Sequence, residues 1–140
     1  MRSVQFFILQ MNNQRIKPMA SKSVRIRVLN SLLVIRDELS QELPDIDRDG
    51  AVWSTASCVL VTCMPDSDGE THVTLGGVNE VGQDGTLIFD RRLETPSRRI
   101  VIDGAMEEKI LQTDVPTSKT RMRIWTNGLR DTDIVTIGLG

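Results

Sequence analysis

Short runs in which apolar and polar residues alternate recur along the whole chain. Val24 to Leu29 alternates apolar with basic side chains, and Arg121 to Trp125 repeats this pattern near the end. A period of two is typical of strands that bury one face. Turn-forming residues such as Gly76-Gly77 and Asn127-Gly128 separate the runs at intervals of roughly 8–12 residues. The pattern predicts an all-β domain, an antiparallel β-sandwich of jelly-roll or Greek-key type with eight or nine short strands.

The densest apolar run spans residues 51–64, and we expect one long strand there. Cys58 to Met64 is rich in β-branched and apolar side chains, which favour a buried pleated surface. Asp66 to Gly69 has turn chemistry, and Thr71 to Leu75 alternates again, so a second strand is expected to pair with the first. The residues that we expect in the core are Val59, Val61, Ile100, Ile102, Ile124 and Val135.

One segment has a helical spacing. Leu39 and Leu43 lie four residues apart within Asp37 to Leu43, but the segment is only two turns long and Pro44 follows it. It is expected to be either a surface turn of helix or a loop. Since no strand-helix alternation appears elsewhere, a parallel α/β sheet is not expected.

A chain of 140 residues is long enough for one domain with its own core, which we place at residues 24–140. Residues 1–23 are expected to be an N-terminal extension or an edge strand. Two alternatives stay open: residues 4–11 form a first strand, or Met19 is the natural start. Phe6 to Leu9 is far shorter than the ~20 apolar residues of a membrane span, so no membrane association is expected.

Composition narrows the set of partners. The formal net charge is −2 and aromatic residues make up 4% of the chain, so neither a strongly polyanion-seeking surface nor a stacking platform is indicated. Direct binding of nucleic acid is therefore not expected. Cys58 and Cys63 would lie roughly 16 Å apart on one strand, too far for a disulfide. Two unpaired thiols fit a reducing compartment, so a cytoplasmic location is expected.

Asp45, Asp47 and Asp49 occupy alternate positions directly before Gly50. This arrangement is typical of the first half of a calcium-binding loop, where hard oxygen ligands open a turn. The twelfth position of such a loop holds a bidentate Glu, and here it holds Ala56. Two interpretations stay open, a solvated acidic turn or a weak cation site that a distant ligand completes. No cofactor is expected, and calcium is the one alternative that the sequence leaves open.

Arginines occur in pairs along the chain. Two pairs lie on expected strands with a spacing of two, which places both members of a pair on one sheet face. If those two strands are neighbours, four guanidinium groups line one face and form a docking surface for an anion or an acidic protein. The alternative is a solvent-facing surface that nearby carboxylates neutralise. The strand pairs are Arg25/Arg27 and Arg121/Arg123, and Arg91/Arg92 and Arg98/Arg99 lie in an expected polar connection between strands.

The chain does not contain a recognisable catalytic motif. His72 is the only histidine, so neither a His-based metal site nor a Ser-His-Asp triad is indicated. Trp53 and Trp125 are expected to anchor the core or its edge. We expect a protein that is not an enzyme.

Three stretches resemble small bacterial nuclease inhibitors of the competence-protein J type and, more broadly, immunity-like proteins. They are the Val- and Thr-rich strand at 59–64, the turn and strand Asp84 to Ile88, and Arg121 to Trp125 before a variable loop and a final apolar strand. The resemblance covers residues 24–139 in outline. It implies a small, acidic, intracellular β protein that binds another protein, and it assigns no functional residue.

These observations together favour a non-catalytic protein-binding module of the inhibitor or immunity type. In such a protein the acidic loop would mimic phosphates in front of a basic cleft. Two alternatives stay open, a calcium-dependent ligand-binding sandwich and a structural subunit of a phage or bacterial assembly. A structural subunit would use a sheet edge or the arginine face to form a homo-oligomer.

Overall fold

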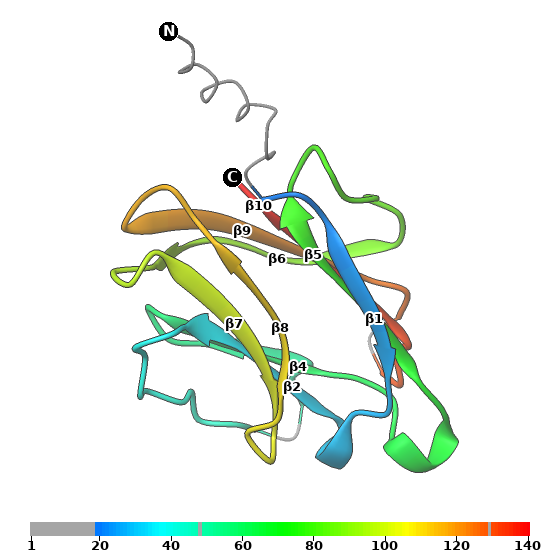
Figure 1. Cartoon of the computed structure of the whole chain (residues 1–140). Helices are drawn as coiled ribbons and strands as arrows, with labels where there is room; N and C mark the ends of the chain where they lie inside the picture. Colours follow the sequence, from blue (N-terminus) through cyan, green and yellow to red (C-terminus); the bar gives the residue numbers. More distant parts are fainter. Residues whose placement is uncertain (1–18, 48, 129) are drawn as a thin grey trace, which may run out of the picture.

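The computed structural model describes residues 19–140 except residues 48 and 129, and in this part of the chain ten strands form two sheets packed face to face (Figure 1). The expected all-β sandwich is therefore confirmed, with ten strands in place of eight or nine. The strand proposed at residues 4–11 lies outside the described residues. The helical elements described are two three-residue 3-10 turns, Leu29–Ser31 (η1) and Asp66–Asp68 (η2), and no helix is long and apolar enough to cross a membrane.

The first sheet, sheet A, is mixed. Its strand β10 (Ile134–Leu139) pairs in parallel with β5 (Thr71–Gly77) and antiparallel with β9 (Lys119–Thr126). The sequence predicted antiparallel pairing throughout the sandwich, and the parallel pair departs from that prediction. The parallel pair arises because β5 and β9 run in opposite directions, so a strand that lies between them must be parallel to one of the two. In spatial order the strands are β1 (Lys22–Ile26), β5 (Thr71–Gly77), β10 (Ile134–Leu139), β9 (Lys119–Thr126) and β6 (Thr86–Glu94).

The second sheet, sheet B, is antiparallel throughout. Its strands in spatial order are β3 (Val52–Ser54), β4 (Cys58–Thr62), β2 (Leu32–Asp37), β7 (Arg99–Gly104) and β8 (Lys109–Asp114). The run at 51–64, expected as one strand, is a hairpin of β3 and β4. The Thr55 amide donates to the Cys58 carbonyl at 2.8 Å, so the chain turns where the sequence contains neither Gly nor Pro.

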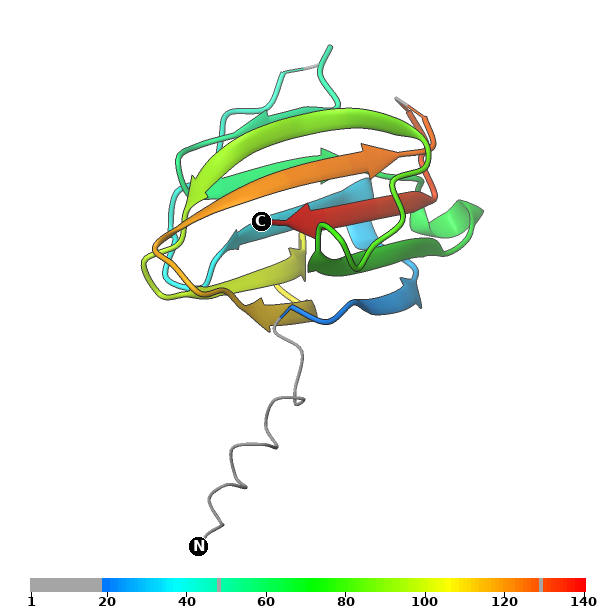
Figure 2. The same ribbon diagram turned by 90° about the horizontal axis from the view of Figure 1, so that it is seen from above.

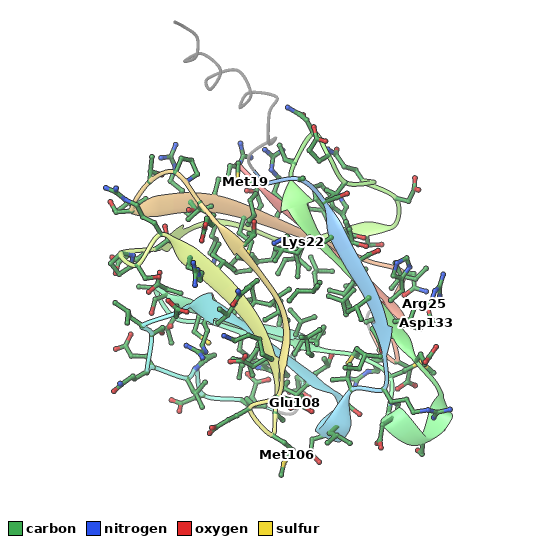
Figure 3. All side chains as sticks on the ribbon, viewed as in Figure 1. Met19, Lys22, Arg25, Met106, Glu108 and Asp133 are labelled. Carbon is green, nitrogen blue, oxygen red and sulfur yellow. The ribbon has the colours of Figure 1, made fainter. Side chains whose placement is uncertain are left out.

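The core lies between the sheets and contains all six residues that the alternation indicated, each fully buried. The sandwich is closed at its sides by long polar side chains. At one side Lys22 Nζ donates to the Gln112 carbonyl at 2.7 Å and joins β1 to β8 (Figure 3). At the other side Arg91 Nη1 donates to Ser54 Oγ at 3.2 Å and joins β6 to β3. These two hydrogen bonds link the sheets at their edges.

Both sheets carry a connection on their outer faces. On sheet A the β5–β6 connection passes over β10 (Figure 2) and covers Trp125, which is only 7% exposed. A methyl group at Gly138 would lie 3.1 Å from the Trp125 ring and 3.2 Å from Val78 Cα, so a larger residue would require these neighbours to shift. On sheet B, Cys58 and Leu60 point outward yet are buried, because the β2–β3 connection lies against that face.

Candidate protein-binding surface

Residues 38–50 of the β2–β3 connection carry five carboxylates, and we refer to this segment as the acidic connection. It has no helical turn in the described residues, so of the two expectations for its first half the loop is correct. Its carboxylates face solvent or are half-buried, and against them the sequence places a single arginine at position 48. The acidic residues are Glu38, Glu42, Asp45, Asp47 and Asp49.

Asp37 anchors the start of the acidic connection. Its side chain is fully buried, and its carboxylate accepts hydrogen bonds from the Leu39 amide at 3.0 Å and from the Ser97 amide at 3.1 Å. The Ser97 hydroxyl donates to the same carboxylate at 2.7 Å. Hydrogen bonds of this kind replace the hydration that a buried carboxyl group loses. Asp37 therefore ties the connection to the β6–β7 turn.

Arg36 provides the second anchor. Its Nε and Nη2 atoms lie 3.0 and 2.9 Å from Asp103 Oδ2 on β7, and its Nη1 donates to the Glu38 carbonyl at 2.7 Å. The guanidinium group thus bridges the outer face of sheet B and the backbone of the connection. Sequence reasoning missed Arg36, Asp37 and Asp103. A signal existed, because each is a charged residue within an otherwise apolar strand, LLVIRD or RIVIDG.

The far end of the acidic connection is a turn built on Asp47. Its Oδ1 accepts hydrogen bonds from the Asp49 amide at 3.0 Å and the Gly50 amide at 2.9 Å. These two amides hold the pKa of Asp47 below its usual range, since they stabilise the carboxylate. The half-buried Trp53 ring packs on Gly50, where a methyl group would lie 2.8 Å from the indole nitrogen. The turn is therefore held on the sheet while its carboxylate stays ionised.

Apolar side chains alternate with the carboxylates. Leu39, Leu43 and Ile46 are 68%, 66% and 54% exposed. A groove of about 660 Å³ separates the first part of the connection from the β7–β8 hairpin, and a second groove of about 440 Å³ lies between Leu43 and Arg91. Exposed apolar side chains beside grooves are typical of protein-binding surfaces.

The calcium hypothesis has no preassembled site. Among the described residues, no three His, Cys, Asp or Glu side chains lie together so as to hold a metal ion. Asp45, Asp47 and Asp49 therefore do not converge, and Asp47 Oδ1 is engaged by backbone amides. Calcium binding stays a prediction that a calcium titration would test.

The strand arginines do not meet on neighbouring strands. Arg25 lies on β1, and Arg121 and Arg123 lie on β9, with β5 and β10 between them. Three interstrand spacings amount to about 15 Å. Arg121 makes a bidentate pair with Asp90 at 2.9 and 2.8 Å, and Arg123 donates to the Gly140 carbonyl. The condition for a four-arginine surface is not met, and Arg27 donates to the Asp66 carbonyl.

Of the remaining arginines, Arg92 lies beside Arg121 on the neighbouring strand β9. The sequence predicted that Arg91 and Arg92 lie in a connection between strands. This prediction is wrong, because β6 extends through Glu94 and includes both residues. Arg91 stands over the Phe89 ring at 5.8 Å, whereas Arg92 pairs in register with Arg121 on the opposite face. Arg99 opens β7, with its Nε 2.9 Å from Asp114 Oδ1. Arg98 occupies the β6–β7 turn with a positive φ of 59°.

Cys58 and Cys63 are free and buried, and burial raises the pKa of each thiol to about 11. At neutral pH both thiols are therefore protonated and poorly nucleophilic. His72 is half-buried on β5, in register with Arg25 of β1 and Ile134 of β10.

Comparison with known proteins places this geometry in context. No protein-family model matches the chain, and no curated protein matches it. Among solved structures, ComJ from Bacillus subtilis, the inhibitor of the DNA degrading activity of NucA, superposes with a TM-score of 0.66 at 12% sequence identity. The match covers 88% of this chain and 98% of ComJ. At this identity the likeness concerns the fold, and the chain shares the sandwich of ComJ along nearly its whole length, as the sequence resemblance implied.

Proposed function

We propose that this protein is a non-catalytic inhibitor that binds a nuclease. The proposal begins from the fold shared with ComJ, which covers nearly the full length of both chains and is not limited to a common core. A shared fold alone does not assign function, so the surface of this chain has to carry the argument.

The observation that carries the proposal is the acidic connection. Nucleases bind the phosphates of DNA with positively charged surfaces, and a row of carboxylates held on a rigid sheet presents the complementary charge. Backbone amides hold the carboxylate of Asp47 in place and lower its pKa, and Asp37 and Arg36 fix the first residues of the connection to sheet B. The carboxylates are thus displayed on an ordered surface.

Binding rather than catalysis also fits the nucleophiles that the structure describes. Both thiols are buried and protonated at neutral pH, which supports a structural role for Cys58 and Cys63. The apolar side chains between the carboxylates supply contact area that charge alone does not provide.

A DNA degradation assay tests this proposal. NucA and the DNA-degrading nucleases of the organism that encodes this chain are incubated with plasmid DNA and a rising concentration of the purified protein. We expect that stoichiometric protein protects the DNA from at least one of these nucleases and that gel filtration recovers the complex. The proposal would be overturned if every nuclease still degraded the DNA fully at about a hundredfold molar excess of the protein.

A further inference from the structure

The groove of about 660 Å³ lies on the outer face of sheet B, between the first residues of the acidic connection and the β7–β8 hairpin. Val34 and Arg36 form its floor, and Leu39 and Leu43 stand on one side of it. Its volume falls in the range of about 300–1,000 Å³ that is typical of pockets for small-molecule ligands, which leaves room for one or two side chains of a partner.

The floor of the groove carries no free charge. Arg36 is neutralised by Asp103, and its Nη1 atom reaches the carbonyl groups of Glu38 and Ser40 in the acidic connection. Beside this pair lies Val34, which is half-buried. An incoming side chain therefore meets Val34 and polar groups that already have hydrogen-bond partners. The residues at the margins of the groove, and not its floor, determine which charge the groove favours.

One side of the groove is apolar, and the margins of the groove carry carboxylates. Leu39 and Leu43 are 68% and 66% exposed, and they would be desolvated by a partner lying in the groove. Glu38 has only a loose pair with Arg99, at 3.7 Å, and Glu107 is exposed on the opposite rim. Lys109 is the one cation that lines the groove outside the Arg36 pair in the described residues. With Glu42 and Asp45 next to it, the groove attracts positive charge.

We infer that the groove receives a basic loop of the nuclease, which inserts one arginine or lysine side chain. The aliphatic stem of this side chain packs on Leu39 and Leu43, and its charged end reaches Glu38 or Glu107. Long cationic side chains bury their methylene groups against apolar surface and keep the charge at a polar edge, which matches this division of the groove. The inference rests on the proposed function and adds to it the position of the interface and the chemistry of the residue that enters.

The test measures affinity for the nuclease that the wild-type protein inhibits, by calorimetry at low salt. The L39S/L43S variant should weaken binding about tenfold or more, because both side chains would lie at the centre of the interface. M106S is the matched control, since Met106 is 64% exposed and lies at the tip of the same hairpin (Figure 3). Its affinity should equal that of the wild type, and melting temperatures should be unchanged in both variants.

Two further measurements identify the occupant. The isosteric variant E38Q/E107Q should weaken binding at low salt and show a shallower dependence of affinity on salt, because two charge contacts are removed. A photo-cross-linker at Gln41, which lines the groove, should capture a nuclease peptide that contains Arg or Lys.

The outcomes separate the two proposals. If the wild-type protein inhibits a nuclease and L39S/L43S binds it with unchanged affinity, the groove is not the interface although the inhibitor function stands. A cross-linked peptide without a basic residue contradicts the proposed occupant. If light scattering shows that the isolated protein is a dimer which L39S/L43S converts to a monomer, the groove is filled by a second copy of the chain and the inference is wrong. A wild-type protein that inhibits no nuclease overturns the proposed function itself.

Discussion

Arg36 on β2 and Asp103 on β7 form an ion pair across sheet B, with Arg36 Nη2 2.9 Å from Asp103 Oδ2. Their side chains are 25% and 8% exposed, so the pair is largely removed from water. The same guanidinium group donates to the Glu38 carbonyl. One interaction therefore stabilises the sheet, closes the floor of the groove and fixes the start of the acidic connection.

Loss of this pair should destabilise the fold. Replacing Asp103 with Ala leaves the Arg36 guanidinium partly buried without its counter-ion, and we expect the free energy of unfolding to fall by about 2 kcal/mol. Asp114→Ala is the control, because it removes a carboxylate from the exposed pair with Arg99 and should cost much less. Urea denaturation of both variants measures the difference. Equal losses would contradict the role assigned to Arg36 and Asp103.

The packing of Trp125 under the β5–β6 connection predicts a glycine requirement. Gly138→Ala places a methyl group against the Trp125 ring and Val78, and overpacking of this kind costs about 1–3 kcal/mol. Gly82→Ala lies in the same connection with no atom within 4 Å of the new methyl group, so its stability should be unchanged or slightly higher. Thermal unfolding followed by tryptophan fluorescence compares the two. A neutral Gly138→Ala would mean that the connection does not cover Trp125 as described.

Two substitutions at Asp47 separate the role of its charge from its role as a hydrogen-bond acceptor in the turn. Because the folded state lowers the pKa of Asp47, the turn gains stability above the ordinary aspartate pKa and loses it as the pH falls through the lowered value. Asp47→Asn keeps an acceptor oxygen without the charge, so the Asp49 and Gly50 amides should stay protected from hydrogen exchange while inhibition at low salt weakens. Asp47→Ala should lose both. If the two variants exchange these amides equally fast, the turn does not depend on the side-chain oxygen.

The buried thiols predict a loss of stability at alkaline pH. The folded state raises the pKa of Cys58 and Cys63 from 9.0 to about 11, so their contribution is complete below pH 9 and declines as the pH rises towards 11. The chain contains no tyrosine, which leaves fewer groups that titrate in this range. At pH 8 a thiol reagent should react with the native protein far more slowly than with the unfolded chain. Rapid modification of both cysteines without unfolding would contradict their burial.

The sequence was sufficient for the fold class and for the core. Val59 and Val61, or Ile100 and Ile102, alternate with residues on the opposite face, and a period of two leaves few other structures open. The β3–β4 hairpin escaped prediction because Thr55-Ala56-Ser57 contains neither Gly nor Pro, and the Thr and Ser hydroxyls that stabilise such a turn are weaker signals. The parallel pairing of β5 with β10 depends on contacts between strands far apart in the chain, which local patterning does not encode.

The candidate surface was predictable only in part. The sequence identified Asp45, Asp47 and Asp49, because their alternate spacing before Gly50 is typical of the first half of a calcium-binding loop. The contribution of Leu39 and Leu43 was hidden, since their spacing suggested a helix and their exposure follows from how the connection lies on sheet B. The expected surface of four arginines does not form, for a related reason. Its formation depended on β1 and β9 being neighbours, and strand order is a property of the tertiary structure.

The measurement that tests the central claim most directly is inhibition of the nuclease by a charge-reversed protein. In the triple variant D45K/D47K/D49K the acidic connection becomes basic, whereas D68K/E70K/D84K makes the same change of charge in the β4–β5 and β5–β6 connections. We predict that the control variant protects DNA as well as the wild type, while the acidic-connection variant fails to protect it and does not form a complex. Equal protection by both variants would show that the acidic connection is not the surface that recognises the nuclease.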